Sequence, residues 1–215
     1  MERGIALLSG GLDSGVAAAM FRAAPGHQLL GCVFLDYGQR AAAKELAAAA
    51  ALGARWQVPL QRLEVPWLGR LAARAGSALL AGAGDLPRGT VQSPGDATSA
   101  RAVWVPARNA VFVTIAAAVA ESLGAGWVIA GFNREEAATF PDNSAEFVAA
   151  ADRLLAFGTR NHVRVQSPTL GFDKAEIVAA ARRLGFGASD FWSCYDGGEV
   201  PCGTCESCLR SRWTR

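Results

Sequence analysis

The chain has 215 residues, which is enough for a hydrophobic core in one large domain, with or without a small appendage. Its net charge of +2, from 21 Lys and Arg against 19 Asp and Glu, provides no global field for nucleic acid or a membrane surface. No apolar run reaches membrane-spanning length, and the first residues lead into a strand without a signal peptide. We therefore expect a soluble, cytoplasmic protein.

The first third of the chain alternates between apolar runs and helical segments. The runs predict strands at 5–8, 28–35 and 57–64, and the segments between and after them predict helices at 15–22, 41–52 and 67–75. This alternation is typical of a doubly wound parallel sheet with helices on its faces.

A segment without clear periodicity follows. Residues 76–102 are rich in Gly, Ser, Pro and Asp and predict a long loop of the kind that often forms a lid. Beyond this loop the sequence predicts a helix at 105–123, a strand at 127–130, a helix at 144–157, a strand at 163–167 and a helix at 173–184. We expect an α/β domain over residues 1–190, with a mostly parallel five-stranded sheet, and a small C-terminal segment over 191–215.

A glycine turn follows the first predicted strand. It consists of Ser9, Gly10, Gly11, Leu12, Asp13 and Ser14. Consecutive glycines allow the backbone to approach a ligand, and the N–H groups of the next helix attract an anion. The spacing fits neither a Walker A loop nor a dinucleotide fingerprint. It resembles the S-G-G-x-D-S loop of the PP-loop ATP pyrophosphatases, which implies that these residues bind the pyrophosphate of ATP; an ordinary capped turn is the alternative.

Polar clusters also follow three other predicted strands. They are Asp36-Tyr37-Gly38-Gln39-Arg40, the segment from Asn133 to Glu136, and Lys174. In open parallel sheets, ligands bind outside the carboxyl ends of the strands, where the chain order reverses. We therefore expect the clusters to meet in one site, although each cluster alone is compatible with a solvated loop.

Four cysteines lie near the end of the chain. Cys194, Cys202, Cys205 and Cys208 have the spacing C-x7-C-x2-C-x2-C. Four thiolates so close in sequence can hold a tetrahedral zinc ion and fold a tail that has little core of its own. Disulfides and an iron–sulfur cluster are the alternatives, which the expected cytoplasmic setting and the spacing disfavour.

Together the motifs resemble the 7-cyano-7-deazaguanine synthase family. The resemblance runs from residue 5 to residue 210 through S-G-G-L-D-S, D-Y-G-Q-R, V-P-A-R-N, K-A-E-I and S-C-Y followed by C-G-x-C-x-x-C. It implies a fold of the adenine-nucleotide α-hydrolase type, a homodimer, and an enzyme that uses ATP, Mg²⁺ and Zn²⁺. The implied reaction converts 7-carboxy-7-deazaguanine and ammonia to the nitrile through an amide, releasing AMP and pyrophosphate.

The resemblance also implies a role for individual residues. The implied catalytic residues are Asp13, Ser14, Lys174 and Arg108; the substrate-binding residues are Tyr37, Gln39, Arg108, Asn133 and Glu136; ATP binds at residues 9–14 and the metal at the four cysteines. A solvated helix residue is the alternative for Lys174, and a surface ion pair is the alternative for Arg108.

One segment departs from the family pattern. Members usually have G-x-N-x-x-D-x-S-G-Y-P-D-C-R after the fourth strand, whereas this chain has Glu136 for the Asp, Phe140 for the Tyr, and Asn143-Ser144 for the Cys-Arg pair. The loss of a guanidinium and of hydrogen-bonding groups changes what this loop can recognise. We favour a divergent synthase. The alternative is a ligase that stops at the amide or transfers the acyl group to an amine of a protein or small molecule.

The C-terminal tail supports a hypothesis from a different class. Residues 209–215 place three Arg around Trp213, which could contact phosphates and stack on a base in a PP-loop protein that modifies or binds tRNA. The run is short and the net charge is low, so a solvated tail is preferred, and we expect neither a nucleic-acid nor a membrane partner. The intact glycine turn disfavours a non-catalytic scaffold.

Overall fold

The computed structural model describes residues 1–89, 97–211 and 213. Its strands are β1 (Glu2–Leu7), β2 (His27–Asp36), β3 (Leu60–Glu64), β4 (Trp127–Ile129) and β5 (Arg164–Gln166). Its helices are α1 (Leu12–Ala23), α2 (Ala42–Trp56), α3 (Pro66–Arg74), α4 (Ala97–Ala102), α5 (Arg108–Ser122), α6 (Arg134–Ala137), η1 (Pro141–Asn143), α7 (Ala145–Gly158), α8 (Lys174–Arg183), η2 (Ala188–Asp190) and α9 (Glu206–Arg210).

The five strands form one sheet in the order β3-β2-β1-β4-β5, and every neighbouring pair is parallel. The chain proceeds from β1 outward to β3, then returns across the sheet to β4 and β5. The carboxyl ends of β1 and β4 therefore flank the point where the strand order reverses, which is where ligands bind in folds of this type. The predicted doubly wound α/β fold is confirmed.

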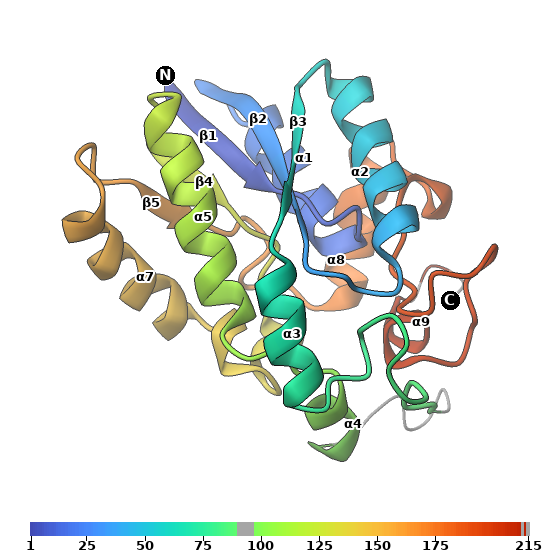
Figure 1. The fold of residues 1–215 in the computed structure, drawn as a ribbon. Helices are drawn as coiled ribbons and strands as arrows, with labels where there is room; N and C mark the ends of the chain where they lie inside the picture. Colours follow the sequence, from blue (N-terminus) through green and yellow to red (C-terminus); the bar gives the residue numbers. More distant parts are fainter. Residues whose placement is uncertain (90–96, 212, 214–215) are drawn as a thin grey trace.

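Helices cover both faces of the sheet (Figure 1). Buried side chains of α3, α5 and α7 pack on one face, and those of α1, α2 and α8 pack on the other. Strand β1 contributes to both layers, since Ile5 lies in the first core cluster and Ala6 in the second. Burial on both faces explains why β1 and β2 are apolar runs without polar alternation.

The structure corrects several element boundaries. Helix α5 begins at Arg108 rather than at residue 105, because Ala107 has a left-handed backbone with φ 54°. Strand β3 begins at Leu60 rather than at residue 57, because Gln57 is the left-handed cap of α2 with φ 57°. The predicted loop at 76–102 contains helix α4, while residues 90–96 of that loop lie outside the described residues.

The C-terminal segment lies against the carboxyl edge of the sheet. Trp192 N donates to Gly10 O over 2.8 Å, which ties the segment to the glycine turn. The short helix α9 follows, a feature that the sequence did not predict. The boundary between a 1–190 domain and a 191–215 segment stays a prediction. No helix in the described ranges combines the length and the apolar character needed to cross a membrane.

Candidate active site

A cavity of about 250 Å³ opens at the carboxyl edge of the sheet, between the glycine turn and the C-terminal segment. Its lining includes every residue predicted for the ATP and substrate sites except Gly10 and Asn133: Ser9, Gly11, Leu12, Asp13, Ser14, Tyr37, Gln39, Arg108, Glu136 and Lys174. The clusters that follow β1, β2, β4 and β5 therefore meet in one place. Their roles as site residues stay predictions.

The glycine turn is shaped by close packing of the backbone. Gly10 has φ +78°, and a Cβ there would lie 2.2 Å from Glu45 O. A Cβ at Gly131 would lie 2.5 Å from Ser14 N, so the end of β4 packs directly on the start of α1. Only glycine fits at both places. Gly10 thus contributes backbone shape behind the cavity rather than a lining surface.

Hydroxyl groups surround the amides of the turn. Ser9 Oγ accepts from Gly11 N over 3.3 Å and lies 2.9 Å from Ser14 Oγ. Ser193 Oγ, from the C-terminal segment, accepts from Leu12 N over 3.4 Å. The N-cap Gly11 offers no side chain to α1, and the positive end of the helix dipole at this turn can attract an anion from the cavity.

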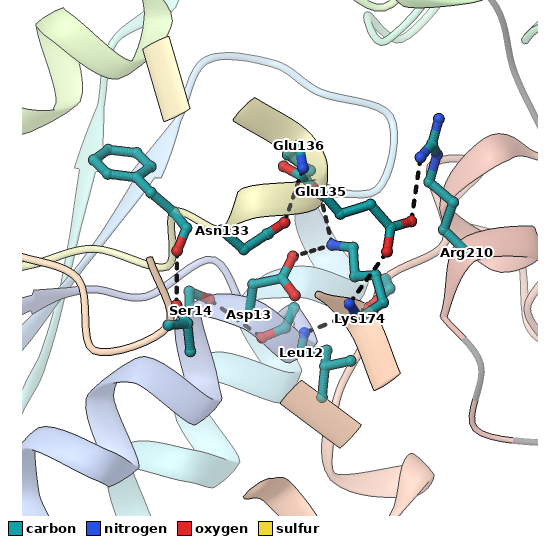
Figure 2. A network of polar contacts seen from close by, with 12 residues as sticks. Leu12, Asp13, Ser14, Asn133, Glu135, Glu136, Lys174 and Arg210 are labelled. Carbon is teal, nitrogen blue, oxygen red and sulfur yellow. Dashed lines mark hydrogen bonds and ion pairs between the residues drawn. The ribbon is translucent and has the colours of Figure 1, made fainter. Parts of the chain in front are cut away.

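Lys174 stands at the centre of the polar network in Figure 2. Its Nζ donates to Asp13 Oδ2 and, over 2.6 Å, to Glu136 Oε1. The three groups come from α1, α6 and α8, and the Lys174 side chain is only 8% exposed. The alternative of a solvated lysine is therefore excluded by its burial and its two carboxylate partners.

Burial and pairing set the protonation of this network. Burial raises the pKa of Asp13 to about 6 in spite of the nearby ammonium. Burial would also raise the pKa of Glu136, but Lys174 outweighs it and holds that pKa below its ordinary value. Burial alone would lower the pKa of Lys174, whereas Asp13 and Glu136 hold it above its ordinary value. Lys174 is thus a permanent cation.

Asp13 also offers an oxygen atom for a ligand. Its Oδ1 is buried and has no hydrogen-bond partner among the described residues. A buried carboxylate oxygen without a donor is costly, and an oxygen-binding cation beside the glycine turn would satisfy it. The site therefore fits a magnesium ion, with Asp13 as the ligand that the chain provides.

Arg108 lines the cavity, whereas Asn133 is buried outside its lining. The Arg108 guanidinium lies beside the Tyr37 hydroxyl; burial raises the pKa of Tyr37, and the guanidinium acts against this shift. Asn133 is fully buried and caps α6, with Oδ1 accepting from Glu136 N over 2.9 Å. In this structure Asn133 orients Glu136 and does not itself face the cavity.

Several lining residues were not among those predicted for the ATP and substrate sites. Glu45 comes from α2, Tyr195 from the cysteine segment, and Glu206 and Arg210 from α9. Arg210 donates to Glu206 Oε1 over 2.9 Å and to Glu135 Oε1 over 3.3 Å. The i, i+4 spacing of Glu206 and Arg210, which carry opposite charges, could have predicted that they pair on one helix face. No local sequence pattern indicated that Glu45 lines the cavity.

The four C-terminal cysteines form one cluster. Their sulfur atoms all lie within 4.8 Å of one another, and none is in a disulfide. Backbone N–H groups point at the sulfurs: Cys202 N donates to Cys194 Sγ over 3.3 Å, and Cys205 N to Cys202 Sγ over 3.3 Å. Such donors stabilise thiolates, so the cluster could hold a metal ion, and the disulfide alternative is disfavoured.

Solved structures share the fold at low sequence identity. The U34-tRNA thiolase NcsA from Methanococcus maripaludis, solved with its 4Fe-4S cluster, has a TM-score of 0.52 and 14% identity, covering 86% of this chain and 56% of that longer chain. An NMN synthetase from Francisella tularensis has a TM-score of 0.52 and 15% identity, over 92% of this chain and 68% of that chain. These two likenesses show the fold alone.

Sequence relatives are much closer. A 7-cyano-7-deazaguanine synthase from Desulforudis audaxviator is 47% identical over 97% of this chain and 94% of its own length. One from Carboxydothermus hydrogenoformans is 43% identical over 100% of this chain and 99% of its own length. The model of the family described as "Queuosine biosynthesis protein QueC" matches residues 3–213. With this match, these relatives and the site geometry in agreement, the chain belongs to the QueC family of 7-cyano-7-deazaguanine synthases.

Proposed function

We propose that this protein converts 7-carboxy-7-deazaguanine and ammonia to 7-cyano-7-deazaguanine, with release of AMP and pyrophosphate. The observation that carries the proposal is the buried Lys174, paired with Asp13 and Glu136, beside the glycine turn in a cavity of about 250 Å³. The relatives that share nearly the whole chain are named for this product.

The glycine turn suits the first step. The substrate carboxylate attacks the α-phosphorus of ATP, and the bond to the bridging oxygen breaks to release pyrophosphate. The amides at the start of α1, together with Ser9 and Ser14, can neutralise the departing charge, and Lys174 adds a fixed cation. Donors that are already in place pay no reorganisation cost when the charge develops.

The remaining steps replace oxygen by nitrogen. Ammonia attacks the acyl carbon, AMP leaves, and a proton is lost to give the amide. A second ATP then adenylates the amide oxygen with release of a second pyrophosphate and a proton, and loss of AMP with a further proton gives the nitrile. Arg108, beside Tyr37, would bind either a phosphate of ATP or the substrate carboxylate bidentately.

Two metals complete the proposal. Asp13, with its unpartnered Oδ1, would hold magnesium, which shields the phosphate charge when bound. The four-cysteine cluster would hold zinc in a closed, structural site, since sulfur supplies all four ligands. The homodimer and the cytoplasmic location also stay predictions; light scattering of the purified protein tests the first.

A product assay tests the function. Purified protein with 7-carboxy-7-deazaguanine, ATP, Mg²⁺ and ammonium should yield the nitrile and two AMP per nitrile, as measured by mass spectrometry and chromatography. Asp13→Asn should abolish AMP release, whereas Asp85→Asn, at an exposed carboxylate outside the cavity, should not. AMP release with only the amide or an amine adduct as product would reject the nitrile and favour the alternative ligase.

A further inference from the structure

Glu45 differs from the other carboxylates that line the cavity. Asp13 and Glu136 are paired with Lys174, and Glu206 is paired with Arg210. Within the described residues, Glu45 forms no ion pair with a Lys or Arg, and its Oε2 accepts from the neutral amide of Gln39 over 2.9 Å. It is therefore a carboxylate on the cavity wall without a bonded cation.

Gln39 fixes the orientation of this carboxylate. Gln39 is 7% exposed, its Oε1 accepts from Tyr37 N over 3.0 Å, and its Nε2 also donates to Leu35 O over 3.4 Å. Because the amide oxygen is bound by the backbone, the NH₂ group must face Glu45. One carboxylate oxygen is thus held by Gln39, and the other is the one that a ligand in the cavity can reach.

Such a carboxylate requires N–H donors from a ligand. Burial raises the pKa of Glu45 to about 7, against the lowering effects of the Gln39 amide and of Arg108. Neutral N–H groups that point at the anion would recover the lost hydration without burying a second full charge. Phe112 and Phe140 also line the cavity and add apolar surface that a flat ligand can contact.

The guanine edge has the required donors. Its ring N1–H and its 2-amino group lie side by side and match one carboxylate, whereas the adenine of ATP lacks this pair of donors. In 7-carboxy-7-deazaguanine this edge and the reacting acid group lie at opposite ends of the bicycle. An edge held at Glu45 thus leaves the acid group for the rest of the cavity.

We propose that Glu45, held by Gln39, is the specificity-determining residue that binds the N1–H and 2-amino groups of the deazaguanine substrate. This inference rests on the proposed function for the identity of the substrate. It predicts that Glu45 acts on the affinity for the acid, and only in the presence of the 2-amino edge, while ATP binds independently of it.

Calorimetry with two ligands tests this inference without turnover. The ligands are 7-carboxy-7-deazaguanine and its analogue without the 2-amino group, added to wild type and to Glu45→Gln in the absence of ammonium and ATP. Wild type should bind the amino ligand about 10- to 100-fold more tightly, because a charge-assisted pair is lost with the analogue. In Glu45→Gln this preference should fall to about 3-fold or less, with the affinity for ATP unchanged.

Further variants separate recognition from folding. Glu64→Gln changes a carboxylate that is 66% exposed on β3 and should leave both affinities at wild-type values. Glu45→Asp keeps the charge but shortens the side chain and should retain part of the preference. Equal loss for both ligands in Glu45→Gln, or a loss confined to ATP, would overturn the inference. An inactive wild type that still shows the Glu45-dependent preference would overturn the proposed reaction alone.

Discussion

The two walls of the cavity are built in different ways. The phosphate wall, residues 9–14, is one continuous hexapeptide whose shape comes from glycine backbone packed on Gly131 and α2. The C-terminal wall, residues 192–195 and 206–211, is held by a cysteine cluster and by side-chain ion pairs. The first wall is therefore built from the backbone of one short segment, whereas the second depends on side-chain contacts, one of which joins Arg210 to the distant Glu135.

Glu135 connects the C-terminal wall to Lys174. Its Oε1 accepts from Arg210 and its Oε2 from the backbone N of Lys174, over 3.3 and 3.2 Å (Figure 2). Damage to either wall should therefore affect Lys174. The phosphate wall acts directly, because Asp13 pairs with Lys174, and the C-terminal wall acts indirectly, through Arg210 and Glu135.

Removal of the shared cation should have the largest effect. Lys174→Met leaves Asp13 and Glu136 side by side without compensation, so we expect activity to fall by at least about 1,000-fold and stability by about 3 kcal/mol. AMP release measures the activity, and the midpoint of unfolding measures the stability. Adding Glu136→Gln should restore stability but not activity. Lys44→Met, at a pair with the exposed Glu199, should change stability by less than about 1 kcal/mol.

Loss of the cysteine cluster should affect the C-terminal wall much more than the phosphate wall. Cys205→Ser should lower metal content and reduce activity by about 100-fold or more, because α9 begins next to this cysteine. Pyrophosphate affinity, which depends on the phosphate wall, should change by less than about 10-fold. Cys32→Ala removes a buried cysteine of β2 and should lower stability while leaving metal content unchanged. Equal loss of pyrophosphate affinity and activity in Cys205→Ser would contradict separate walls.

The same distinction explains what the sequence could predict. The strands, the glycine turn and the cysteine cluster are local patterns, and the strand ends brought Lys174 and Glu136 to the site as expected. Helix α6 was missed because its four residues are too few for a periodic pattern; Asn133 stabilises it through a cap. Glu45 was missed because its position depends on how α2 packs, which no local pattern encodes.

A smaller effect on activity is expected when the contact between Arg210 and Glu135, which links the C-terminal wall to Lys174, is removed. Arg210→Gln should lower kcat by about 10-fold or more with little change in the KM for ATP, since it loosens Glu135 and hence Lys174 without touching the glycine turn. Arg210→Lys should recover part of the loss. Arg183→Gln, on the exposed side of α8, should have no effect on either constant. A matching rise in the KM for ATP would show that the link serves the phosphate wall instead.

The smallest expected effect concerns stability and has the opposite sign. Because burial raises the pKa of Glu45 from 4.5 to about 7, the folded state binds this proton more tightly than the unfolded state. The contribution of Glu45 to stability is therefore highest below pH 4.5 and decreases as the pH rises to about 7. Glutamine does not ionise, so Glu45→Gln should gain about 1 kcal/mol relative to wild type between pH 5 and pH 6, a shift of about 2–4 °C in melting temperature. A difference between the two proteins that stays constant across this range would show that the cavity leaves the carboxylate fully hydrated, in which case Glu45 would have no unmet need for a ligand's N–H groups.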